Sequence, residues 1–68
     1  MDPRLVDTPE LFRQLDLYAA MLPVSTIVAL KLMAELGIKP TTFEPAVVGI
    51  YRSYAAIDAE LRARGALK

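Results

Sequence analysis

The sequence predicts an all-α fold: a compact three-helix domain with helices at about residues 9–22, 24–36 and 45–64. Proline and glycine residues divide the chain into three segments. Within each segment, apolar residues recur at steps of three and four, which is the spacing of one helix face. No segment shows the sustained alternation of a half-buried strand. Since 68 residues hold only one core, we expect residues 1–68 to form a single helical interaction domain.

The first predicted helix begins at Thr8-Pro9-Glu10. Threonine is a good N-cap, proline suits the first helical position, and a glutamate interacts favourably with the positive end of the helix dipole. Pro23 ends this helix, because the residue before a proline is disfavoured in the α conformation. The apolar face that we expect to enter the core consists of Leu11, Leu15, Tyr18 and Leu22.

The second predicted helix runs from about Pro23 or Ser25 to Leu36, and Gly37 provides its C-terminal stop. Its apolar residues cover most of the helix circumference and leave only a narrow stripe for charged side chains. A helix that is apolar on nearly every side is typical of a central position. We therefore expect neighbouring helices to pack against it on both flanks.

The third predicted helix follows the longest connection, residues 38–44, and extends from Pro45 to about Arg64, where Gly65 ends it. Its basic C-terminal residues are expected to complement the negative end of the helix dipole; they are Arg62, Arg64 and Lys68. The apolar seam repeats in steps of three and four, as in packed helix pairs; it consists of Val47, Ile50, Tyr54, Ile57 and Leu61.

The composition excludes several classes of chemistry. The sequence contains no cysteine, histidine or tryptophan. Disulfide frameworks, thiol nucleophiles, imidazole acid–base catalysis and zinc or haem ligation through Cys or His are therefore excluded. Ser25 and Ser53 have no histidine to activate them, and the three glycines are too dispersed for a phosphate-binding loop. We expect no enzyme, no catalytic residue, no cofactor and no metal site.

Charge argues against direct binding of nucleic acid. Eight basic residues balance eight acidic ones, so the net charge is zero. The segment Leu36-Gly37-Ile38 resembles the turn of a helix-turn-helix, but a recognition helix would begin within three or four residues and carry basic or amide side chains. Here Arg52 is the only basic residue between Lys39 and Arg62. Direct nucleic-acid binding is therefore not expected, although a helix-turn-helix regulator remains an alternative.

The apolar content is high for a chain of this size. Apolar residues make up 54% of the sequence, and the mean hydropathy is +0.34. The uncharged stretch from Leu17 to Leu30 is shorter than the roughly 20 residues of a membrane span, and Pro23 interrupts it. The N-terminus lacks the basic region of a signal peptide, so we expect a cytoplasmic protein. We expect a protein partner, or a second copy in a homodimer, to cover the excess apolar surface.

Five residues are the candidate partner-binding side chains. Aromatic and methionine side chains beside a helix seam are typical of binding surfaces. The same side chains also commonly cover the rim of a small core, so both roles stay open from the sequence. The five candidates are Phe12, Leu17, Met21, Val48 and Tyr51.

Two stretches carry a family resemblance. Residues 29–37, ALKLMAELG, followed by Pro40, and residues 56–66, AIDAELRARGA, are similar to segments of a variant helix-turn-helix domain family encoded on proteobacterial integrative and conjugative elements. That family includes transcriptional activators of element transfer and small antiactivators that bind LuxR-type quorum-sensing regulators. In the family, the Gly-Ala segment leads into further helices, whereas this sequence stops at Lys68. The resemblance therefore implies a domain that binds a regulator protein rather than DNA.

The sequence and the resemblance together predict a small protein-binding regulator. We expect it to sequester a transcriptional activator of the LuxR type, or another transcriptional regulator, through an apolar helical surface. Two alternatives remain, a helix-turn-helix DNA-binding regulator and a small chaperone or assembly subunit of a secretion or phage system.

Overall fold

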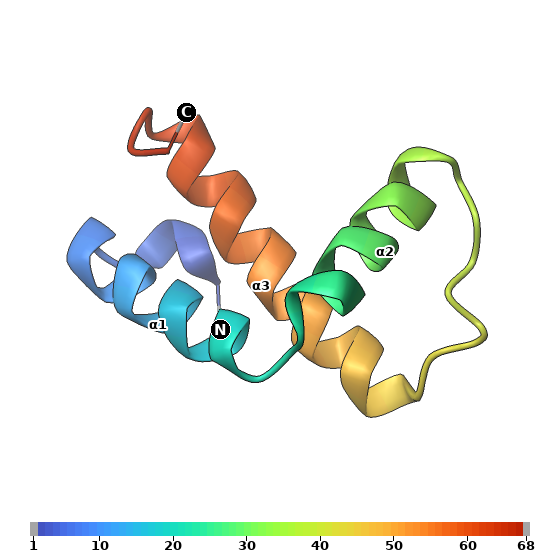
Figure 1. Cartoon of the computed structure of the whole chain (residues 1–68). Coiled ribbons are helices and arrows are strands. Elements are labelled where there is room, and N and C mark those ends of the chain that lie inside the picture. The colour runs from blue at the N-terminus through green and yellow to red at the C-terminus, as the bar shows by residue number, and fades with distance from the viewer. Residues whose placement is uncertain (1, 68) are drawn as a thin grey trace.

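The computed structural model describes residues 2–67 and confirms the all-α fold (Figure 1). Within this range the chain forms three α-helices and no strand. The helices are α1 (Thr8–Ala20), α2 (Val24–Glu35) and α3 (Pro45–Ala63). Each boundary lies within two residues of the predicted one. A short 3₁₀ turn, η1 (Pro3–Leu5), precedes α1 and was not predicted.

The main core lies between α1 and α3. Leu11 of α1 and Ile57 and Leu61 of α3 are almost completely buried and contact one another. These residues belong to the two apolar seams predicted from the sequence, so the predicted faces are confirmed. The half-buried side chains packed around this cluster are Val6, Phe12, Leu15, Tyr18 and Leu67.

Helix α2 turns away from α1 at Leu22-Pro23, and the two helices are bent by 105° relative to each other. It crosses α3 and packs against it much less extensively than α1 does (Figure 1). Leu30 is the one side chain of α2 that is fully buried. The expectation that this helix is packed on both flanks is therefore wrong. The central helix is α3, which packs against η1, α1 and α2.

Both predicted glycine stops are confirmed. Gly37 and Gly65 have φ angles of +71° and +75°, a conformation that glycine adopts without a steric penalty. The N–H of Ile38 donates to the carbonyl of Met33 at 2.8 Å, which satisfies one of the last carbonyls of α2. An equivalent bond forms at the end of α3. Each glycine therefore reverses the chain and ends its helix.

The beginning of α1 differs from the predicted cap. Thr8 is the first helical residue, and Asp7 at the N-cap position makes no side-chain capping hydrogen bond. The Thr8 hydroxyl instead accepts a hydrogen bond from Nη1 of Arg64 at 3.1 Å. The Thr8 hydroxyl, which the sequence predicted to cap the helix, therefore binds a residue 56 positions away in the chain.

Arg64 joins the two ends of the described chain. Its Nη2 donates to the carbonyls of Pro3 and Val6, at 3.1 and 2.6 Å, and its Nε donates to Glu60 at 2.7 Å. The predicted role of Arg64 was only to complement the dipole of α3. In the structure it also fixes η1 against α3, because one guanidinium donates to backbone carbonyls of the N-terminal segment as well as to a carboxylate of α3. Lys68, the third predicted dipole partner, lies outside the described residues.

Candidate functional site

Exposed apolar side chains are concentrated in one part of the chain. Of the eight large apolar residues exposed among residues 2–67, seven lie between residues 17 and 38, and the eighth is Leu5. We call these seven the apolar strip. All of them are at least half exposed. The apolar strip consists of Leu17, Met21, Val24, Val28, Leu32, Leu36 and Ile38.

The α2 part of the apolar strip faces away from the core. Val24, Val28, Leu32 and Leu36 follow one another at steps of four, so they form a single ridge along the helix. At 100° per residue this ridge points about 180° from Leu30, which is the buried contact with the rest of the domain. The side chains of this ridge are apolar, as in a buried helix, but they are exposed to solvent.

A groove of about 420 Å³ runs between α2 and α3. Its floor is mostly apolar, and the charged side chains Lys31, Asp58 and Arg62 stand at its margin, where Asp58 and Arg62 form an ion pair of 2.9 Å. The other residues that line it are Ala19, Val24, Ile27, Val28, Tyr51, Tyr54 and Ala55.

Tyr51 lies at the crossing of α2 and α3. It lines the groove and also a second hollow of about 190 Å³, which it shares with Leu30 and Val48. Its ring lies 6.3 Å from that of Tyr54, with the planes tilted by 35°. Burial raises the pKa of the Tyr51 hydroxyl, and the charge of Asp58 acts in the same direction. Tyr51 therefore presents a neutral, largely apolar ring to both hollows.

The five predicted contact residues fall into three groups. Leu17 and Met21 are exposed and belong to the apolar strip, while Val48 and Tyr51 are half-buried and line hollows beside α2. Phe12 packs against the main core. The structure thus places four of the five beside the strip or within it, and Phe12 in the rim of the core.

The sequence-based candidates omitted the ridge of α2. Val24 is the most exposed large apolar side chain of this helix, at 77%, yet it was assigned to a helix packed on both sides. The signal was present, because apolar residues lie all around α2. This pattern indicates that every face of α2 is favourable to bury against another protein surface. It does not say whether the cover comes from this chain.

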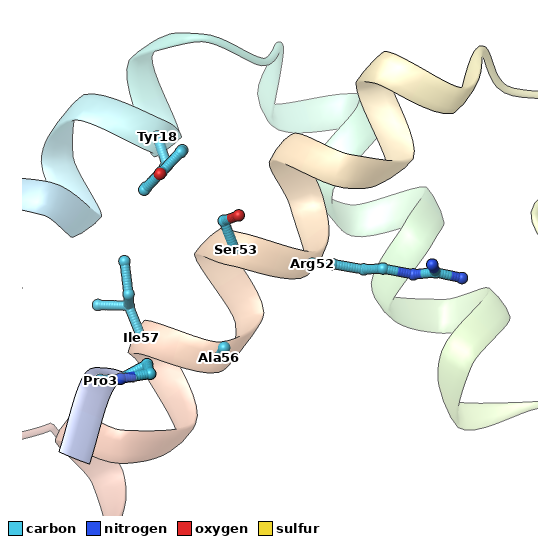
Figure 2. A pocket seen from close by; sticks show the side chains of 6 residues that line it. All are labelled: Pro3, Tyr18, Arg52, Ser53, Ala56 and Ile57. Carbon is cyan, nitrogen blue, oxygen red and sulfur yellow. The ribbon is translucent and has the colours of Figure 1, made fainter. Parts of the chain in front are cut away.

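A further hollow of about 270 Å³ lies where η1, α1 and α3 meet (Figure 2). Figure 2 shows Tyr18 and Ile57 pointing into the space between α1 and α3, while Arg52 extends away from both. Ser53 contributes a hydroxyl, but no carboxylate lines this hollow. The lining therefore supplies no base that would activate the serine.

Four of the eight acidic side chains of the described residues form ion pairs with arginines, and one of these is the pair of Asp2 with Arg4. Glu10 pairs with Arg13, Asp58 with Arg62 and Glu60 with Arg64. Hydrogen bonds from Arg13 and Gln14 lower the pKa of Glu10 to about 2. Within residues 2–67 no group of three potential metal ligands comes together. The pairs of Glu10, Asp58 and Glu60 join residues three or four positions apart on one helix, which is the spacing that supports a helix.

The hydropathy of α1 and α2 also bears on membranes. In the part of the chain that the structure describes, no single helix is long and apolar enough to cross a bilayer. Taken together, α1 and α2 reach the required length and composition, but the bend of 105° separates them.

The apolar strip and the adjoining groove are the most distinctive surface of the described chain, because both expose side chains that normally enter a core. Polar groups stand only at the margins, which is the arrangement of a protein-binding surface. Comparison of the chain with protein-family models, curated proteins and solved structures gave no match.

Proposed function

We propose that the chain is a small protein-binding regulator, and that the apolar strip with the adjoining groove is its contact surface. The observation that carries the proposal is the concentration of seven of eight exposed large apolar residues between positions 17 and 38. Exposed apolar patches mark interaction sites, and within the strip Val24, Val28, Leu32 and Leu36 adjoin one another along one helix. We expect binding at this surface to be driven by the burial of apolar side chains.

The charge distribution favours a protein partner over DNA. Arg4, Arg13, Arg62 and Arg64 each form an ion pair with a carboxylate, so they offer little net charge to phosphates. At the start of α3, where a recognition helix would contact bases, Ala46 is exposed and has no donor or acceptor for a base edge.

The proposed partner is a transcriptional activator of the LuxR type. This part of the proposal rests on the resemblance of residues 29–37 and 56–66 to the family that includes antiactivators. A partner that is bound through the apolar strip is withdrawn from its own target by mass action. Regulation then depends on the concentration of this chain and on its affinity for the activator.

The test is a binding titration with a purified LuxR-type activator from the same genome, combined with a promoter reporter for that activator. Co-expression of the chain is expected to lower the reporter signal. Met21→Arg changes a side chain that is 59% exposed, so it should leave the fold intact and weaken binding at least tenfold. Tyr51→Ala is expected to weaken binding by about 1–2 kcal/mol.

Leu5→Arg is the matched control, because Leu5 is also apolar and is 85% exposed, but lies outside the apolar strip. It should bind like the parent chain. Equal loss in both arginine variants, or no binding of the activator by the parent chain, contradicts the proposal. A sequence-dependent shift of DNA by the chain alone, with a steep dependence on salt, supports the DNA-binding alternative instead.

A further inference from the structure

The domain exposes more surface than its mass requires. The accessible surface is 4767 Å², whereas a folded monomer of 7.5 kDa exposes about 4,250 Å². The radius of gyration is 12.1 Å, against about 11 Å for a chain of this length. The surplus is about 500 Å². Helix α2 covers α3 only where the two helices cross, so much of the surface of both helices stays exposed.

Helix α2 has little stability of its own. Twelve residues form at best a marginal helix in water, and the first turns contain the β-branched residues Val24, Thr26, Ile27 and Val28. No side chain caps its N-terminus, and neither end carries a charge that complements the dipole. Packing must therefore hold α2, and the domain provides packing on one face only.

The outward ridge of α2 is suited to an identical ridge. Rows of residues at steps of four interlock in the commonest class of helix packing, with the helices crossing at about −50°. The last three residues of the ridge are symmetric about Leu32, with Val28 on one side and Leu36 on the other, while Val24 extends beyond them at the start of α2. In an antiparallel pair with a two-fold axis near Leu32, Val28 faces Leu36 of the second copy, and the two Leu32 side chains meet.

Charge complements this arrangement. Lys31 and Glu35 lie along the same edge of the ridge and carry opposite charges. A two-fold axis brings each edge of an antiparallel helix against the same edge of its copy. Lys31 then lies near Glu35 of the second copy, and the reverse pair forms by symmetry. Lys31 is only one residue from the axis, so it also approaches Lys31 of the second copy, and the two Lys31–Glu35 pairs outnumber this single like-charged pair.

We propose that a second copy of this chain covers the ridge of α2, in a symmetric dimer with antiparallel α2 helices and a two-fold axis near Leu32. The surplus of the two copies together is about 1,000 Å², which is comparable with the area at which specific interfaces begin. The inference rests on the proposed function, since it assigns one part of the apolar strip to self-association. Leu17 and Met21, on α1, lie outside this interface and stay accessible to a different protein.

The first experiment uses the absence of cysteine from the sequence. Leu32→Cys places one thiol near the axis, so mild oxidation of the full chain is expected to give a disulfide-linked dimer in high yield. Leu5→Cys is the control, with a thiol at another exposed position, and should remain mostly monomeric on gels. Equal cross-linking of the two variants overturns the proposal.

The second experiment is a charge-reversal cycle followed by sedimentation equilibrium. The parent chain is expected at twice the 7.5 kDa monomer mass at high concentration. Lys31→Glu and Glu35→Lys should each raise the dimer dissociation constant several-fold, because each puts like charges together across the axis. The double variant restores the complementary pairs and should return most of the affinity. A double variant weaker than both single variants contradicts the antiparallel arrangement.

The two proposals fail in different ways. Leu32→Arg should give a folded monomer, by circular dichroism and sedimentation, because Leu32 is half exposed in the domain. A parent chain that is monomeric up to millimolar concentration, but binds the activator, overturns the dimer alone. A parent chain that dimerises, but binds no activator and does not lower the reporter, overturns the proposed regulator alone.

Discussion

Helices α1 and α2 are almost equal in length, with 13 and 12 residues, yet they relate to the core in opposite ways. In α1 the apolar residues lie on one face, and charged residues such as Arg13 and Asp16 occupy the other. The apolar face of α1 packs against α3, where Leu11 is completely buried. In α2 the apolar residues surround the helix, and α3 covers only the side that carries Leu30. Amphipathic pattern thus indicates where a helix packs, whereas uniform apolarity indicates only how much cover it needs.

The ends of the two helices differ in the same sense. Glu10 lies in the first turn of α1, where it favours the helix dipole, and it also binds Arg13 and Gln14. The first turn of α2 contains no acidic residue. Local interactions therefore support α1 even before it packs, while α2 depends on tertiary contacts.

The largest expected effect comes from breaking the α1–α3 core. Leu61 is 0% exposed, so Leu61→Ala should lower the free energy of unfolding by about 2–5 kcal/mol through lost burial and a cavity. Leu32→Ala, at a side chain that is 51% exposed, should lower it by less than about 1 kcal/mol at concentrations where the chain is monomeric. Urea denaturation measures both. Equal losses would show that α2 carries as much of the stability as α1.

Removal of the Arg64 contacts should be the next largest effect. Arg64→Met keeps the aliphatic part of the side chain but removes the hydrogen bonds to Glu60 and to the carbonyls of Pro3 and Val6. We expect a loss of about 1–3 kcal/mol in the free energy of unfolding, with faster amide exchange in η1. The control is Arg62→Met, which breaks a more exposed pair with Asp58 and should change the free energy of unfolding much less. Similar losses in the two variants would contradict a special role for Arg64.

The fold was largely predictable because its signals are local. Gly37 and Pro23 mark helix ends through the backbone conformations they allow, and Leu11 and Ile57 lie on faces that periodicity defines. The function of Arg64 was not predictable, since its contacts join residues about 60 positions apart. No local pattern contains that information.

The candidate site was predictable in part. Leu17 and Met21 were among the predicted contact residues, and the structure leaves both exposed. Leu32 and Val24 were not predicted as contact residues, because in a uniformly apolar helix the sequence pattern does not show which residues are buried. The choice of exposed face was made by the angle at which α2 crosses α3, which is a tertiary property.

Glycine substitutions separate the end of α2 from the interior of α3. Gly37→Ala forces a φ of +71° on a residue with a Cβ and should cost about 1–2 kcal/mol in the free energy of unfolding. Gly49 lies inside α3 with open space around an added Cβ, so Gly49→Ala should stabilise the chain by about 0.5–1 kcal/mol. Thermal melts by circular dichroism measure both signs. A destabilised Gly49→Ala variant would contradict the open space found around this position.

The smallest effect is expected at the acidic end of the pH range, from α1. Hydrogen bonds from Arg13 and Gln14 lower the pKa of Glu10 from 4.5 to about 2 in the folded chain. The folded state therefore binds fewer protons than the unfolded state between these values. Its contribution is fully present above pH 4.5 and is lost as the pH falls to 2.

Glu10→Gln should accordingly reduce the fall in thermal midpoint between pH 4.5 and pH 2, while leaving the midpoint at pH 2 close to that of the parent chain. Arg13→Met removes the main donor and should flatten the same part of the profile. The effect is small because both side chains are exposed and screened by solvent. If neither variant changes the slope, the Glu10–Arg13 pair does not support α1, and the contrast between its first turn and that of α2 disappears.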